Sequence, residues 1–306
     1  MISGADSRSG NALSGFWRTA WVPSVAKNGS TNCSQISKRF AAVSARLRPF
    51  VDRIWGWESA TAVPLPLLFP GTGAELVFHY GAPFSVREKT GDCRLLERAL
   101  TMCLRSRACQ LVATGPVGFM AVRLRGEALR HFAEIPLAEW IDGFAPIGVG
   151  LGDGWQDVPA LLADAPGFGA RAALLEERLV RHLAQREVRP ALVDRAVTRL
   201  YYGADSVQIG NLADGLNLSA RHFERLFNAA TGLTPKRFQR VARFHHVMRR
   251  LLLEQRSRYL ETALTGGFYD QAHFIHECRD FTGQAPRELL TPKHYLSHFY
   301  NSRLAG

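Results

Sequence analysis

The chain has 306 residues, of which 46% are hydrophobic and 21% are charged. This composition excludes an intrinsically disordered chain, because enough apolar residues are present to form packed cores, and the length favours two domains. The formal net charge is +11, and residues 171–306 hold 21 Lys and Arg against 13 Asp and Glu. A basic excess in one half of a chain is typical of a domain that binds nucleic acid.

The cysteines and the apolar segments indicate the cellular compartment expected for the protein. The five cysteines contain no Cys-x-x-Cys pair; they are Cys33, Cys93, Cys103, Cys109 and Cys278. This excludes a zinc ribbon and a disulfide framework, and it favours reduced thiols. The N-terminal residues lack the apolar h-region expected of a signal peptide, and Pro64 and Pro66 interrupt the most apolar stretch, 62–70. We therefore expect a cytoplasmic protein with no membrane partner and no cofactor.

The first half of the chain reads as a β-rich domain. Residues 1–35 are rich in Ser, Gly and Asn and predict a flexible N-terminal arm. From 51 to 125, short β-rich runs are separated by Gly and Pro, and residues 75–80 alternate as a half-buried strand does. We predict a β-rich sensor or dimerisation domain over 36–189.

Helices are expected to complete this domain. The segment 170–187 carries an apolar stripe formed by Leu174, Leu175, Leu179 and Leu183. These helices are expected to dock on the strands or to pair between subunits. The residue before a proline disfavours the α region, so Arg189-Pro190 predicts a domain boundary near Pro190.

Beyond this boundary the chain repeats itself. His222-Phe223 corresponds to His273-Phe274, and each pair follows a small residue, Ala213 or Ala263. Both segments predict a short helix, a tight turn and an amphipathic helix that ends at Thr-Gly, which is the plan of a helix-turn-helix unit. Two such units predict a bipartite reader of double-stranded DNA.

The turns and caps of the two units have matching chemistry. Gly267 tolerates a positive φ without strain, and Asn217 stands at the matching place in the first unit. Ser219 and Asp270 are predicted to cap the second helix of each unit.

Helical spacing separates an inward face from an outward face on each second helix. The inward side chains are Phe223, Phe227 and Ala230 in the first unit and Phe274, Cys278 and Phe281 in the second. The predicted DNA-binding side chains are Arg221, Glu224, Arg225 and Asn228 in the first unit and Gln271, Ala272, Ile275, His276 and Arg279 in the second. Arg suits guanine, Gln suits adenine, Glu accepts from cytosine, and Ala or Ile meets a thymine methyl. Lys236, Arg240 and Arg243 suit either phosphate contact or a solvated helix face.

Residues 195–295 resemble the DNA-binding domain of AraC/XylS-type regulators. The resemblance rests on Ser219-x-Arg221-His222-Phe223-x-Arg225-x-Phe227 with Gly232-x-x-Pro235, and on Gly267-Phe268-x-Asp270-Gln271-x-His273-Phe274 with Gly283-x-x-Pro286. It implies an all-α domain over 190–295, in which a long helix over 236–253 joins two units that enter successive major grooves. A tail of 296–306 follows.

The upstream part resembles an uncharacterised domain found in some of these regulators. The matching stretches are Arg53-Ile54-Trp55-Gly56-Trp57, residues 68–81 and Val122-Arg123-Leu124-Arg125. The resemblance implies an α+β chain whose N-terminal part is a cupin-like barrel with attached helices. It implies a transcription regulator, not an enzyme, with an operator, RNA polymerase, a small-molecule effector and a second copy of the chain as expected partners.

Two residues depart from the family pattern in the second unit. His276 stands where the family usually shows Arg, and Cys278 where it usually shows a large apolar residue. We expect the first change to weaken a contact with DNA, and the second to leave less volume in the core of that unit.

Several side chains admit two interpretations. For His222 and His273, packing against the first helix of the unit is favoured over base reading. For Glu75 and His79, which share a strand face, a solvated face is favoured over a ligand site. Trp55 and Trp57 fit ordinary core packing or the lining of an apolar pocket.

A rival function is a DNA-binding domain fused to an enzyme that accepts a methyl group on a zinc-bound cysteine. Such a site needs four clustered cysteines, whereas Cys93, Cys103 and Cys109 are widely spaced. His273, His276 and Cys278 cannot all face one ion from a single helix, so no metal is expected.

Overall fold

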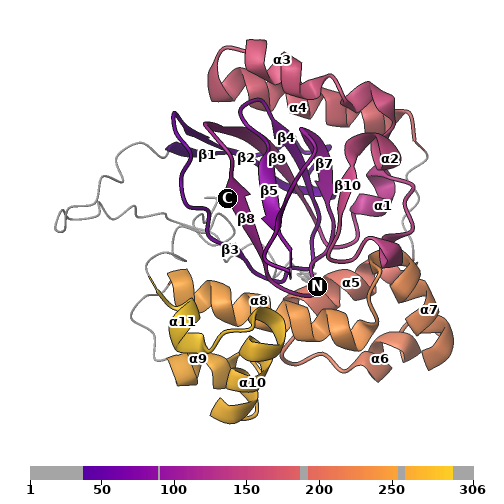
Figure 1. Cartoon of the computed structure of the whole chain (residues 1–306). Helices are drawn as coiled ribbons and strands as arrows, with labels where there is room; N and C mark the ends of the chain where they lie inside the picture. The colour runs from indigo at the N-terminus through magenta and orange to yellow at the C-terminus, as the bar shows by residue number, and fades with distance from the viewer. Residues whose placement is uncertain (1–36, 89, 187–191, 254–258, 292–306) are drawn as a thin grey trace, which may run out of the picture.

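The computed structural model describes residues 37–88, 90–186, 192–253 and 259–291. The predicted N-terminal arm, the tail of 296–306 and the boundary at Pro190 lie outside these residues. Two antiparallel sheets form the N-terminal part, and the helices of the C-terminal part lie beneath them (Figure 1).

The larger sheet supplies the centre of the N-terminal domain. Its strands, in spatial order, are β1 (Ser37–Ala41), β2 (Val51–Ser59), β9 (Val117–Leu124), β4 (Glu75–His79), β7 (Ala99–Met102) and β10 (Phe144–Pro146). The smaller sheet has the order β3 (Leu67–Leu68), β8 (Cys109–Ala113), β5 (Phe84–Arg87) and β6 (Cys93–Leu95). Apolar side chains of both sheets share one core. Because strands form the first part of the chain and helices the second, the chain belongs to the predicted α+β class.

Strand β4 differs from the expected half-buried strand. All five of its residues are buried. Leu76 and Phe78 face the core beneath the helices, and Val77 faces the core between the sheets. Both faces of this strand are covered, because it lies between β9 and β7 with a helical layer on one side and the smaller sheet on the other.

Short helices cover the outer face of the larger sheet. They are α1 (Leu129–Phe132), η1 (Leu137–Glu139), α2 (Ile147–Leu151), η2 (Asp153–Trp155), α3 (Val158–Asp164) and α4 (Gly167–Ala184). In the predicted stripe of α4, Leu175 and Leu179 are fully buried, whereas Leu174 and Leu183 are partly buried against the same core. The interpretation that these helices dock on the strands is therefore confirmed.

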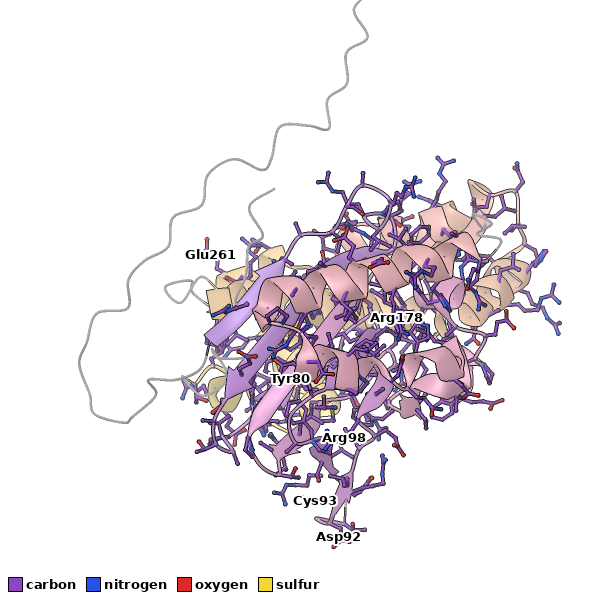
Figure 2. The ribbon with its side chains drawn as sticks, turned by 90° about the horizontal axis from the view of Figure 1, so that it is seen from above. Tyr80, Asp92, Cys93, Arg98, Arg178 and Glu261 are labelled. Atoms are coloured by element: carbon purple, nitrogen blue, oxygen red, sulfur yellow. The ribbon has the colours of Figure 1, made fainter. Side chains whose placement is uncertain are left out.

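Polar contacts at the surface hold this layer in place. Arg178 on α4 makes two hydrogen bonds to the carboxylate of Asp157, which precedes α3. Arg171 pairs with Glu58, and its guanidinium lies 4.0 Å from the ring centroid of Tyr80. Figure 2 labels Tyr80 and Arg178 near the helices that cover the sheet, and Asp92 and Cys93 at the lower edge of the view.

The C-terminal part is helical throughout its described residues. Its helices are α5 (Leu192–Tyr202), α6 (Ile209–Asp214), α7 (Ala220–Thr231), α8 (Pro235–Leu253), α9 (Tyr259–Thr265), α10 (Gln271–Thr282) and α11 (Pro286–Leu289). Helix α8 is the long joining helix that the family resemblance implies. None of the described helices is long and apolar enough to cross a membrane.

The two parts of the chain share their cores. Phe238 on α8 contacts Phe227 at 5.3 Å between ring centroids, and both belong to the cluster that also contains Leu124 of β9. Phe244, further along α8, lies 6.2 Å from Phe69 of the β domain. The helices of the C-terminal part are thus packed against the β domain along α8.

The shared core predicts that both parts lose stability together. Phe238→Ala removes a fully buried ring and is expected to lower the free energy of unfolding by about 3–5 kcal/mol. Chemical denaturation followed by circular dichroism measures this change. Leu192→Ala, at a side chain that is 63% exposed, is the control and should shift stability by about 0.5 kcal/mol or less. A loss confined to the C-terminal helices would contradict the shared core.

Candidate nucleic-acid interface

Both repeated segments form the predicted helix-turn-helix geometry. The turn residues Asn217 and Gly267 have φ values of 54° and 87°. Ser219 Oγ accepts from the N–H of His222, and Asp270 Oδ1 accepts from the N–H of His273. The predicted turns and caps are therefore confirmed in both units.

The predicted inward faces of α7 and α10 are buried. Phe223 and Phe227 on α7 are at most 1% exposed. On α10, Phe274 and Cys278 are fully buried, and Phe281 lies 5.0 Å from the ring of Phe244 on α8. Burial of these faces leaves the opposite side of each helix for a partner.

The outer face of α7 lines a hollow in the surface. Arg221, Glu224 and Arg225 are exposed and Asn228 is half-buried. The residues around the hollow are Ser219, Arg221, His222, Glu224, Arg225 and Asn228. The interpretation that His222 packs against the first helix of its unit is wrong, since its side chain is exposed beside Arg221 and Arg225.

The outer face of α10 has fewer charges. Gln271, Ala272, His276 and Arg279 are exposed, and Ile275 is half-buried. Gln271 Nε2 donates to the hydroxyl of Tyr259 on α9 at 2.5 Å. Tyr269, which the sequence reasoning missed, is 88% exposed just before α10.

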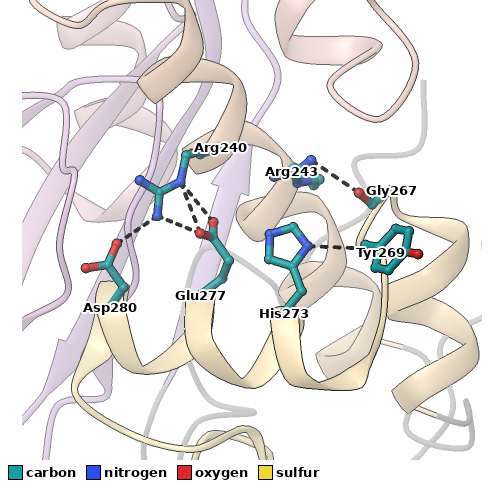
Figure 3. A network of polar contacts seen from close by, with 7 residues as sticks. All are labelled: Arg240, Arg243, Gly267, Tyr269, His273, Glu277 and Asp280. Carbon is teal, nitrogen blue, oxygen red and sulfur yellow. Dashed lines mark hydrogen bonds and ion pairs between the residues drawn. The ribbon is translucent and has the colours of Figure 1, made fainter.

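His273 has a structural role. Its ring lies 5.3 Å from the ring of Phe268, and its Nδ1 accepts from the N–H of Tyr269 at 3.3 Å (Figure 3). The side chain therefore orders the turn before α10, and its partners lie in that turn, not in the first helix of the unit that the packing interpretation named.

Two arginines of α8 hold the second unit together. Arg240 donates to Glu277 at 2.5 Å and to Asp280 at 2.8 Å, both on α10. Arg243 donates to the carbonyl of Gly267 at 3.2 Å (Figure 3). Its guanidinium lies 5.0 Å from the ring centroid of Phe268. These contacts show that Arg240 holds α10 and that Arg243 holds the turn before it, while a phosphate contact of either arginine stays a prediction. Lys236, at the start of α8, is exposed.

A second candidate site is a cavity between the two sheets. Trp55, Trp57, Glu75 and His79 all line it. The solvated-face interpretation of Glu75 and His79 is wrong, because both side chains are buried there. The two faces of β4 are covered, which the alternating pattern alone did not reveal.

Burial and one ion pair set the charges in this cavity. Burial lowers the pKa of His79 to about 4, so the ring is neutral near pH 7. Burial also raises the pKa of Glu75, and Arg123 opposes this effect from 3.5 Å. The cavity is therefore apolar except for a neutral imidazole and a carboxyl group paired on one side.

The four described cysteines, Cys93, Cys103, Cys109 and Cys278, show no arrangement that would hold a metal. Within the described residues no group of three His, Cys, Asp or Glu side chains could bind a metal ion. Cys93 is exposed at the β5–β6 hairpin (Figure 2), whereas burial raises the pKa of Cys103 to about 12 and of Cys109 to about 11. High thiol pKa values disfavour the thiolate that methyl transfer to cysteine needs.

Comparisons with known proteins agree with the two-part architecture. A family described as a helix-turn-helix domain matches residues 212–291, and a domain of unknown function (DUF6597) matches residues 40–146. The first match spans both repeated units, and the resemblance of residues 195–295 to an AraC-type DNA-binding domain is confirmed. None of the curated proteins that were compared matches the chain.

Solved structures similar to this chain include several of ToxT from Vibrio cholerae. One ToxT structure has a TM-score of 0.47 and 8% identity, over 84% of this chain and 97% of ToxT. ToxT bound to an unsaturated fatty acid has a TM-score of 0.41 and 8% identity, over 78% of this chain and 93% of ToxT. A third, bound to (E)-4-(8-methylnaphthalen-1-yl)but-3-enoic acid, has a TM-score of 0.44 and 8% identity, over 84% and 97%.

The turn before α10 predicts a sensitive glycine. Gly267→Ala places a side chain at a φ of 87°, where its Cβ would lie 3.0 Å from Asp205. We expect a loss of about 1–2 kcal/mol in the free energy of unfolding. The control is Gly210→Ala within α6, where nothing lies within 4 Å of the added carbon and about 1 kcal/mol of stabilisation is expected. Equal effects of the two substitutions in urea denaturation would contradict this account of the turn.

Proposed function

We propose that this chain, a DNA-binding transcription regulator with an AraC-type helix-turn-helix domain, reads two successive major-groove segments with α7 and α10. The observation that carries the proposal is the pair of matched units, each with a buried apolar face and an exposed polar face. A helix of this kind fits the major groove, where base edges present a distinct pattern of donors and acceptors. The regulator acts by binding an operator in the cytoplasm, without catalysing a reaction.

The two helices supply different base contacts. Arg221 and Arg225 on α7 suit guanine, Glu224 suits the amino group of cytosine, and Asn228 suits adenine. On α10, Gln271 suits adenine, Ala272 and Ile275 suit thymine methyl groups, and His276 and Arg279 supply polar contacts. Lys236 at the start of α8 is placed to contact a phosphate. The first unit therefore carries more of the charged readout than the second.

The β domain is proposed to modulate DNA binding. It shares its cores with α5, α7 and α8, so a change in its shape alters the packing of the reader. Arg237 on α8 donates to Ser106 of the β domain at 2.8 Å, and the N–H of Ala108 donates to the carbonyl of Phe281. We propose that a small molecule in the cavity or a second copy of the chain supplies the signal, and that RNA polymerase responds to it.

Arg225 provides the test of base reading. Selection from random duplexes first defines the preferred sequence. Arg225→Ala is then expected to weaken binding to it by roughly 1–3 kcal/mol and to relax preference at one position, because one bidentate contact is lost. Arg87→Ala, at an exposed arginine of β5, is the control and should leave binding unchanged. If binding to every sequence falls by the same factor, Arg225 contacts phosphate and the base assignment is wrong.

His276 provides the test of the second helix. His276→Arg is expected to tighten binding by on the order of tenfold, because a permanent guanidinium makes two charge-assisted hydrogen bonds with a base or phosphate. The logarithmic salt slope should steepen by about one if the new contact is a phosphate. His276→Gln, which adds no charge, is the control and should not tighten binding. Filter-binding isotherms over a salt series measure both effects. An unchanged affinity of the His276→Arg variant would show that residue 276 does not contact DNA.

A further inference from the structure

Two buried polar atoms in the cavity of the β domain have no hydrogen-bond partner among the described residues. They are Glu75 Oε2 and His79 Nε2, and both side chains project from β4 into the cavity lining. Glu75 is 1% exposed and His79 is not exposed at all. An unsatisfied buried polar atom costs about 1–3 kcal/mol, so its presence at two places in one cavity points to a ligand that pairs with them.

The contact of His79 with the backbone determines which ring nitrogen carries the proton and which one accepts a hydrogen bond. Nδ1 lies 3.3 Å from the carbonyl oxygen of Arg98, and a carbonyl oxygen can only accept a hydrogen bond. Nδ1 therefore carries the proton of the neutral ring, and Nε2 is left as an acceptor. Phe84 and Phe119 flank the ring at 4.6 Å and 6.2 Å between centroids, which keeps Nε2 in an apolar setting.

Glu75, at the start of the same strand, presents a second acceptor. Its Oε1 lies 3.5 Å from Nη1 of Arg123, which leaves Oε2 to face the cavity. An anionic ligand would place its charge beside this carboxyl group and beside the lone pair of His79. Such a contact is repulsive, and it is strong where water is excluded.

The rest of the lining is apolar and largely aromatic. It includes Trp55, Trp57, Phe84, Phe119 and Phe144. These rings favour a compact apolar body, and they also tolerate an amine, because a cation is attracted to the face of an aromatic ring.

The size of the cavity limits how such a body enters. Its volume is about 30 Å³, which accommodates one or two water molecules. A ligand the size of a benzene ring enters only if part of the lining moves. Leu65 and Pro66 are the lining residues between β2 and β3, outside any strand.

We infer that this cavity binds a small apolar molecule that carries an O–H or N–H donor, and that it rejects carboxylates. The donor pairs with His79 Nε2 or Glu75 Oε2, and the apolar body packs on the aromatic side chains. The inference rests on the proposal that the β domain senses a small molecule, and it is independent of the base sequence that is read.

Four probes with one shared body test the ligand class on the full chain. They are benzyl alcohol, benzylamine, toluene and benzoate, with binding followed by thermal shift and by tryptophan fluorescence. One hydrogen bond of about 1 kcal/mol corresponds to about a fivefold difference in affinity. At least one of the two probes that carry a donor, benzyl alcohol and benzylamine, should therefore bind about fivefold more tightly than toluene. Benzoate should not bind. Benzoate binding as tightly as the donors, or no binding by any probe, overturns the inference.

Variants at the two acceptors locate the preference. At least one of the variants His79→Leu and Glu75→Gln should reduce it, because the donor pairs with one of the two acceptors. Thr101→Val is the matched control, because Thr101 is equally buried on β7 but does not line the cavity. If the folded His79→Leu and Glu75→Gln variants both keep the preference for donor probes over toluene, the ligand binds elsewhere.

The DNA function is measured separately on the same samples. Binding of the probe-free protein to its selected duplex tests the proposed reader. Loss of DNA binding with intact donor preference contradicts the proposed function alone, whereas intact DNA binding without donor preference contradicts the ligand class alone.

Discussion

The burial of α8 by three neighbours is the constraint on which the rest of the structure depends. Phe238 packs on Phe227 of the first recognition helix, and Phe244 lies between Phe281 of the second unit and Phe69 of the β domain. Each ring is fully buried or nearly so. Because close-packed interiors resist deformation, the two recognition helices and the β domain cannot shift independently of this helix.

Apolar packing holds both recognition helices, and an ion pair is added on the second. On the first unit, apolar burial around Phe223 and Phe227 is the main attachment. On the second, Phe274 and Phe281 are buried in the same way, and Arg240 on α8 also binds Glu277 and Asp280. Glu277 is 3% exposed, so its carboxylate depends on Arg240 for compensation. Attachment of the second unit thus combines apolar packing with an ion pair, which is the more directional of the two.

The cavity between the sheets and the helices of the C-terminal part approach each other at one end of the larger sheet. Arg123 pairs with Glu75, which lines the cavity, and donates to the carbonyl of Gly73 at 2.8 Å. A few residues further along the chain, Gly126 is close enough to Phe238 that an added Cβ would lie 3.4 Å from its ring. Arg123 and Gly126 lie three residues apart in the chain, so the wall of the cavity at Glu75 is linked to α8 through this short segment. This proximity gives a physical route by which occupancy of the cavity biases the packing of the reader.

The sequence by itself determined the local structure of the DNA-binding half. The turn at Asn217 and Gly267, the caps at Ser219 and Asp270 and the inward phenylalanines all follow from short-range geometry, which residue type and helical spacing encode directly. Only the tertiary structure decided the roles of residues whose partners lie far along the chain. His79 is buried because a second sheet covers β4. Arg240 holds α10 because it binds Glu277, which lies 37 residues further along the chain. Long-range packing of this kind depends on how layers and helices come together in space, and no periodicity within a segment records it.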